Sequence, residues 1–279
     1  PAGRLNATWY RADVQLPDIM DYDIIKGKRT YQFFDGEVCY PFGHGLSYSS
    51  FEYRNIQLDK KVLQLNDEAL ISFDVRNISE LAGEEVVQWY VRAGTSRVKR
   101  PFKQLRGFER IHLEPGETKK VSFRLPAADL AIWDVTREKF TVEAGEYTIM
   151  IGASSNDIRL TGTLQVAGEI IPPRNLRQVT KAINYDDYEG VIIGECKEGG
   201  SCITDVHDGD WLLFREADLN GGVHYFEARA ASESGGTIEI RLDSPDGMLA
   251  GTWVSGASGV RDVYLKFTGE LHLSWFRFA

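Results

Sequence analysis

The sequence predicts an all-β protein that contains two β-sandwiches, one after the other. From Phe51 onward, short stretches alternate apolar and polar residues, as half-buried strands do. Turn-forming residues such as Leu113-Glu-Pro-Gly-Glu117 separate these stretches. The pair Pro172-Pro173 divides them into two sets, because two prolines block both a helix and a central strand. Repeated short strands at this spacing are typical of sandwiches.

The bulk composition argues against several classes of partner. The chain has 279 residues, enough for two ordinary domains, and 43% of them are apolar. A formal charge of −9 and a pI near 5.2 argue against nucleic acid, because phosphate contacts need basic patches. No apolar run approaches the length that spans a bilayer, so no membrane partner is expected. The first residues show no signal-peptide pattern, and the compartment stays open between cytoplasmic and secreted.

Residues 1–45 do not predict a domain of their own. They show no strong periodicity and include two irregular polar stretches. Such a segment cannot bury enough surface to fold alone. We therefore expect it to pack on a partner, namely sequence that precedes it.

An aromatic, glycine-containing stretch runs from Tyr40 to Phe51. Glycines on both sides of His44 allow backbone turns that other residues disfavour, and the four aromatic residues around it can bury large areas. On chemistry alone, this stretch is a tight loop with an aromatic core. Its composition suits a junction at which one domain ends and the next begins.

The strands expected in each sandwich follow from the alternation. The first set comprises Phe51 to Leu58, Ala69 to Val75, Glu85 to Val91, Thr118 to Leu125, Glu146 to Gly152 and Ile158 to Val166. The second set comprises Asp210 to Phe214, Val223 to Ala230, Thr237 to Leu242, Val260 to Phe267 and Leu271 to Phe278.

Several motifs in the first part of the chain resemble glycoside hydrolase family 3 enzymes, the β-glucosidases and β-xylosidases. The junction, YPFGHGLSY, resembles the YPFGYGLSY run that ends the α/β sandwich domain of that family. Pro1–Trp9 resembles the late motif NPAGRLPVTW, and Lys28–Phe34 resembles GRTYRYF. Ala82–Val91 resembles the AGEEVVQLYV strand of the domain that follows. The resemblance implies a remnant of the α/β sandwich domain at residues 1–45 and a fibronectin type III-like domain at residues 46–167.

The last part of the chain resembles family 6 carbohydrate-binding modules, which are β-jelly-roll sandwiches. The resemblance rests on Tyr225–Gly247, on the turn Gly209-Asp-Trp211 and on the closing Ser274–Phe278. It implies a module at residues 178–279, joined to the preceding domain by a linker at residues 168–177.

No residue of the chain is assigned to catalysis. A retaining glycosidase needs two carboxyl groups held at a fixed separation around the sugar. The resemblance implies that the nucleophile and the acid/base belong to upstream domains, and the SDW-type nucleophile motif does not occur here. It also implies that Arg29 and Tyr31 lie near the sugar site, either at the active-site rim or, as we favour, in packing at the domain interface.

The last module differs from family 6 modules at the positions that bind sugar. Such modules hold a sugar ring between a Tyr and a Trp, with an Asn from the last strand. The Tyr position corresponds to Asp205, the Asn position to His272, and the loop that carries the Trp is deleted. We therefore predict that the usual cleft is lost, and that residual weak carbohydrate binding uses Trp253, Asp205 and His272. The alternative for Trp253, which we favour, is a structural role in the core or at an interface.

No metal and no cofactor are predicted. The loop Asp205–Asp210 lacks the alternating oxygen ligands and the distant Glu of a calcium loop, and is read as a β-turn. The acids that bind structural calcium in family 6 modules correspond to Lys181, Ile183 and Ser274, which removes charge and ligands together. Cys196 and Cys202 bracket a hairpin-like stretch, and the sequence leaves a disulfide and two free thiols both open.

Together these observations predict the non-catalytic C-terminal region of a family 3 β-glycosidase. The parent would hydrolyse terminal β-D-glucosyl or β-D-xylosyl residues. The expected partners are the upstream catalytic domains and β-linked oligosaccharides. The alternative is a structural or adhesive β-domain protein without sugar affinity.

Overall fold

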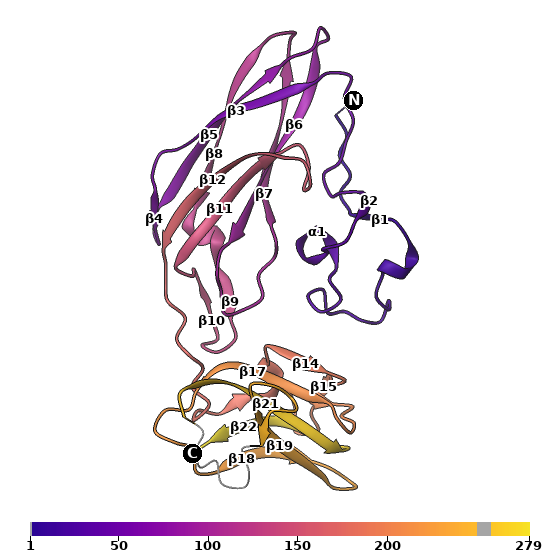
Figure 1. The fold of residues 1–279 in the computed structure, drawn as a ribbon, viewed down its shortest axis with the longest axis vertical. Coiled ribbons are helices and arrows are strands. Elements are labelled where there is room, and N and C mark those ends of the chain that lie inside the picture. Colours follow the sequence, from indigo (N-terminus) through magenta and orange to yellow (C-terminus); the bar gives the residue numbers. More distant parts are fainter. Residues whose placement is uncertain (1, 250–257) are drawn as a thin grey trace. The chain divides into compact units, whose positions relative to one another are not determined.

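A computed structural model describes residues 2–249 and 258–279, which divide into two compact units (Figure 1). The first unit comprises Pro1–Ile132 and Phe140–Ile170, and the second comprises Trp133–Lys139 and Ile171–Ala279. About 50% of the chain is strand and 5% is helix, which confirms the predicted all-β class. Among the described residues, no helix has the length and apolar character needed to cross a bilayer.

The first unit contains a sandwich of two sheets (Figure 1). One sheet has the strand order β3-β5-β8, and the other has the order β4-β12-β11-β6-β7. Neighbouring strands are antiparallel except for β12 and β4, which run parallel. The strands are β3 (Phe51–Leu58), β4 (Val62–Gln64), β5 (Glu68–Asn77), β6 (Gly83–Ala93), β7 (Gln104–Leu113), β8 (Thr118–Pro126), β11 (Gly145–Gly152) and β12 (Ile158–Ala167). Between β8 and β11 the chain forms the 3₁₀ helix η2 (Ala127–Leu130) and the paired strands β9 (Ile132–Asp134) and β10 (Lys139–Thr141).

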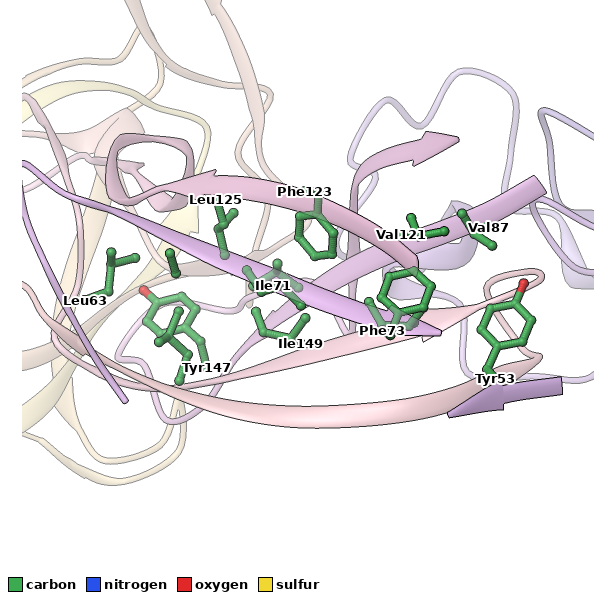
Figure 2. Packing of buried hydrophobic residues seen from close by; sticks show 14 of the residues in the cluster. Tyr53, Leu63, Ile71, Phe73, Val87, Val121, Phe123, Leu125, Tyr147 and Ile149 are labelled. Carbon is green, nitrogen blue, oxygen red and sulfur yellow. The ribbon is translucent and has the colours of Figure 1, made fainter. Parts of the chain in front are cut away.

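One hydrophobic core lies between these two sheets. Every second residue of β5 is fully buried, including Ile71 and Phe73. They belong to one cluster with Phe123 of the same sheet and Ile149 of the other, as Figure 2 shows. Burying side chains of this size stabilises a fold by about 1.5–3 kcal/mol each. The alternation that predicted the strands is therefore the alternation that builds the core.

Residues before Phe51 form little regular structure. They contain the antiparallel pair β1 (Trp9–Tyr10) and β2 (Val38–Tyr40), the 3₁₀ helix η1 (Asp13–Gln15) and the short helix α1 (Thr30–Phe33). Their contacts with the sandwich centre on β6, which is buried on both faces. Val87 and Val91 point into the core, whereas Gln88 and Tyr90 belong to the opposite face and are also buried.

The side chain of Gln88 fastens the junction to the sandwich. Its Nε2 donates hydrogen bonds to the carbonyl oxygens of Gly43 (3.0 Å) and Ala153 (2.6 Å). Its Oε1 accepts a hydrogen bond from the hydroxyl of Tyr90 (2.6 Å). Gly43 has φ +79°, and a Cβ at this position would lie 2.0 Å from the Gln88 Oε1. The junction therefore requires glycine both for its backbone conformation and for space.

A buried carboxyl group ties a second point of the N-terminal segment to the sandwich. The Oε1 of Glu85 accepts hydrogen bonds from Arg4 Nη2 (3.2 Å) and from the hydroxyl of Tyr53 (3.1 Å). The Arg159 guanidinium lies over the Tyr53 ring, 4.8 Å from its centroid. Burial raises the pKa of Glu85, and the charges of Arg4 and Arg159 and the Tyr53 hydrogen bond offset that rise only in part.

The second unit contains two five-stranded sheets around a core that includes Phe214, Phe267 and Phe276. One sheet has the order β13-β22-β16-β15, and β18 also pairs with β22 in this sheet. The second sheet has the order β14-β17-β21-β19-β20. The elements are β13 (Thr180–Lys181), η3 (Ala182–Asn184), β14 (Asp187–Glu189), β15 (Ile192–Glu195), β16 (Ser201–Thr204), β17 (Trp211–Asp218), β18 (Phe226–Ala231), β19 (Gly236–Leu242), β20 (Met248–Leu249), β21 (Val260–Gly269) and β22 (His272–Phe278).

The stretch around the two prolines is hydrogen-bonded at both ends. In the first unit, the amide of Ala144 donates to the carbonyl of Glu169 (2.8 Å). In the second, the amide of Arg174 donates to the carbonyl of Glu216 (2.8 Å), and the guanidinium of Arg174 pairs with Asp186 (2.9 Å). Each end is therefore built into the unit beside it.

Replacing Glu85 by Gln should remove a pH-dependent cost of folding. The folded-state pKa of Glu85 is raised above its ordinary value of 4.5. The folded state therefore favours the protonated carboxyl, and stability is lost as pH rises from the unfolded pKa through the folded pKa. We expect E85Q to gain free energy of unfolding relative to the wild type across that window, measured by urea denaturation at a series of pH values.

The neighbouring Glu84→Gln is the matched control with the opposite sign. A hydrogen bond from Arg110 lowers the pKa of Glu84, so this carboxylate stabilises the fold above its unfolded pKa and loses that effect on acidification. A difference between E85Q and the wild type that does not change with pH would contradict the role given to the buried charge.

Candidate functional site

A groove of about 700 Å³ lies on one face of the sheet that contains β16, β22 and β18. Ile203 of β16 and Leu273 of β22 point into the core, so the residues beside them face the groove. The groove is lined by Cys196, Lys197, Glu198, Cys202, Arg229, Ala230, Ala231, Ser232, Glu233, Glu270, His272 and Ser274. These residues come from the β15–β16 turn, β16, β18 with the turn after it, the β21–β22 turn, and β22.

The walls of the groove are polar and charged. Arg229 of β18 donates from Nε to Glu198 in the β15–β16 turn (3.1 Å), and this pairing lowers the pKa of Glu198. Lys197 in the same turn lies 3.7 Å from a carboxylate oxygen of Glu233. Among the described lining residues none is Phe, Tyr or Trp, so the groove as described lacks the large aromatic ring on which a sugar usually stacks.

The structure brings one of the three predicted sugar-binding residues to this groove. His272 is exposed at the start of β22 and lines the groove. Asp205 follows the end of β16, is exposed, has φ +54° and is not among the lining residues. Trp253 lies outside the described residues.

Arg29 and Tyr31 make contacts within the first unit. The guanidinium of Arg29 donates to the carbonyls of Asp18 (2.7 Å) and Asp21, which closes the loop before it. The Tyr31 ring stacks on Phe42 with a centroid separation of 4.3 Å, and its hydroxyl accepts a hydrogen bond from the Leu105 amide (3.0 Å). Their role at an active-site rim stays a prediction.

The acidic loop Asp205–Asp210 uses its carboxylates to hold backbone. Asp210 accepts a hydrogen bond from the His207 amide (2.8 Å), and Asp208 accepts one from the Gly269 amide (2.6 Å). Across residues 2–249 and 258–279, no cluster of three or more His, Cys, Asp or Glu side chains is placed to bind a metal.

The residues at the positions that correspond to calcium ligands lie in different surroundings. Lys181 forms an exposed ion pair with Glu138 of the same unit (2.7 Å), and Ile183 packs against the core of the second unit. Ser274 lines the groove instead.

Sequence reasoning missed most of the groove. Arg229, Glu198 and Ser274 were not singled out as ligand-facing residues. The signal that could have found Ser274 is its alternation with the apolar Leu273, because successive residues of a strand face opposite sides of the sheet. Glu198 and Arg229 are distant in sequence and meet only because β16 and β18 both pair with β22.

Comparison with known proteins agrees with this two-unit structure. Residues 85–155 match the fibronectin type III-like domain, and residues 181–279 match the carbohydrate binding module of family 6. A putative β-xylosidase of Formosa agariphila is 40% identical over 161 residues, which cover 58% of this chain and 21% of that protein. Thermostable β-glucosidase B of Acetivibrio thermocellus is 44% identical over 140 residues, which cover 50% of this chain and 18% of that protein. The chain thus spans about a fifth of the length of these curated relatives.

Solved structures of β-glucosidases are also similar to part of this chain. The family 3 β-glucosidase of Bifidobacterium adolescentis matches with a TM-score of 0.55 and 30% identity, over 62% of this chain and 27% of that one. The β-D-glucoside glucohydrolase of Trichoderma reesei matches with a TM-score of 0.54 and 32% identity, over 60% of this chain and 27% of that one. The predicted resemblance is therefore confirmed: the chain is similar to an accessory C-terminal region of family 3 β-glycosidases. Its residues 85–155 are similar to the fibronectin type III-like domain, and its residues 181–279 are similar to the family 6 carbohydrate-binding module.

Calcium should not change the stability of the second unit. The resemblance implies that Lys181, Ile183 and Ser274 stand where family 6 modules have acidic calcium ligands, and a calcium site needs several oxygen ligands, usually including carboxylates. We expect thermal unfolding curves in EDTA and in millimolar calcium to coincide. A melting temperature that rises clearly with added calcium would show that other oxygens have rebuilt the site.

Proposed function

We propose that the chain is the non-catalytic C-terminal region of a family 3 β-glycosidase, and that it serves mainly to support the catalytic domains. The proposed parent hydrolyses terminal β-D-glucosyl or β-D-xylosyl residues. Similarity to proteins named β-glucosidase and β-xylosidase supports this proposal. So does the order of a junction, a fibronectin type III-like domain at residues 46–167, a connection at residues 168–177 and a family 6-like module at residues 178–279.

The observation that carries the proposal is the apolar surface of the N-terminal segment. Large apolar side chains there are exposed, among them Ile19 (82%) and Tyr22 (81%). The full set is Trp9, Val14, Leu16, Ile19, Met20, Tyr22, Ile24, Tyr40, Leu46 and Tyr48. Soluble monomers rarely expose so many apolar residues in one segment, because each costs free energy in water. We infer that the preceding catalytic domains of the same enzyme cover this segment.

Buried hydrogen bonds in the first unit also support the proposal that the catalytic domains cover the N-terminal segment. The buried carboxyl of Glu85 is held by Arg4 and Tyr53, and the buried amide of Gln88 is held by Gly43 and Ala153. These polar groups fix the N-terminal segment on the sandwich. The segment is thus anchored to the sandwich near both of its ends.

Association with the catalytic region tests the proposal. The chain and the proposed catalytic region are expressed separately and mixed. We expect a stable complex, turnover of nitrophenyl β-glucoside or β-xyloside by the catalytic partner, and no turnover by the chain alone. The double variant Ile19→Asn, Tyr22→Asn should weaken the complex by at least about tenfold, because it removes two apolar anchors.

Ile78→Asn is the matched control, since Ile78 is also exposed but lies after β5 on the sandwich. It should leave the affinity unchanged. Turnover by the chain alone that disappears when one of its own acidic residues is replaced would overturn the accessory role. Absence of any complex would favour the alternative, a structural or adhesive β-protein.

For the second unit we propose weak carbohydrate binding at most. The groove offers charged and polar groups but no Phe, Tyr or Trp among its described lining residues, and sugar sites usually combine polar groups with a large aromatic platform. Residual binding of β-linked oligosaccharides is proposed to use His272, Asp205 and Trp253. Of the two that the structure describes, His272 lines the groove and Asp205 does not.

Affinity electrophoresis and calorimetry with xylo- and cello-oligosaccharides test this proposal. We expect no tight complex, and a further loss of any weak retardation in His272→Ala. His224→Ala is the matched control, because His224 is an exposed histidine of the same unit that does not line the groove. Tight binding that survives in His272→Ala would show that the module binds sugar elsewhere.

A further inference from the structure

Two cysteines lie across the hairpin that forms one wall of the groove. In the β15–β16 ladder, Gly194 pairs with Cys202, and the amide of Cys196 donates to the carbonyl of Gly200 (2.9 Å). Alternation along paired strands therefore places Cys196 and Cys202 on the same face, as diagonal neighbours. Both line the groove, and both are free thiols in this structure.

The two thiols differ in exposure. Cys202 is 1% exposed, whereas Cys196 is half-buried. Burial, together with the neighbouring Cys196 thiol, raises the pKa of Cys202 to about 11. The more exposed partner is thus the one that a reagent can reach first.

We propose that Cys196 and Cys202 form a reversible disulfide, made by exchange with a low-molecular-weight disulfide such as oxidised glutathione, and that this bond fixes the groove wall. In the first step the Cys196 thiolate attacks the reagent, forms a mixed disulfide and releases one glutathione thiolate. In the second step the Cys202 thiolate attacks the Cys196 sulfur and releases the second. Two protein thiols are oxidised and one glutathione disulfide is reduced, and the two protons lost by the protein thiols are taken up by the two released glutathione thiolates.

The turn that this bond would close has few other constraints on its backbone. Gly199 and Gly200 are adjacent and both have positive φ, at +92° and +76°. Lys197 and Glu198 in the same turn form exposed ion pairs across the groove, which are weak tethers in water. A bond from Cys196 to Cys202 closes the turn at its base and reduces the freedom of the chain that carries these charges.

Oxidation of the whole chain carrying Cys39→Ser tests the proposal, because Cys39 is an exposed thiol that would react independently. The chain is equilibrated with oxidised glutathione, unfolded in acid, labelled with maleimide and weighed by mass spectrometry. We expect both thiols to disappear together, a mass lower by two hydrogen atoms, and a digest peptide that links the two cysteines. The melting temperature of the second unit should rise, and dithiothreitol should reverse all three changes.

Single variants separate the two steps. Cys202→Ser should stop at a glutathione adduct on Cys196, and Cys196→Ser should leave the buried Cys202 unreacted. A stable glutathione adduct on Cys196 while Cys202 is present would overturn the proposal, and so would two thiols that stay free. The result with the Cys39→Ser chain decides the matter even if a variant at the buried Cys202 fails to fold.

Discussion

The need to satisfy buried polar groups on β6 determines how the first unit is assembled. An antiparallel strand in a sandwich normally shows one face to the core and the other to water. Here the second face of β6 is covered as well, so the amide of Gln88 loses its water and must find protein partners. It finds them in the carbonyls of Gly43 and Ala153. A polar side chain on a sheet thereby fixes the path of a segment that has almost no regular structure.

The sequence predicted the strands that bury many side chains, and it predicted less where strands bury few. β5 alternates fully buried with more exposed residues, and its position was clear from the pattern alone. β7 was not predicted as a strand, because it is the last strand of its sheet and buries only Ile111 and Leu113. Short strands such as β13 have too few residues to show any period.

The candidate groove could not be predicted from the sequence, for a different reason. Its walls come from several strands whose neighbours in space are not neighbours in sequence, and the order of strands around β22 decides which side chains meet. His272 could be matched to a family position, and the structure places it in the groove. Asp205 could be matched in the same way, but the left-handed conformation at the end of β16 is a local backbone property that the motif did not reveal. For the two cysteines the sequence left two possibilities open, because the hairpin register decides whether they meet.

The contact between Gly43 and Gln88 also limits how such chains can be recombined. Gly43 belongs to the junction and Gln88 to the sandwich, yet a single carbon added to Gly43 would collide with the side chain of Gln88. A chimera spliced between them would join a loop from one enzyme to a sandwich from another, and would fold well only if both parents carried the same pair. Exchange of the accessory region is therefore easier at a splice point upstream of the junction, so that the glycine and the glutamine are transferred together.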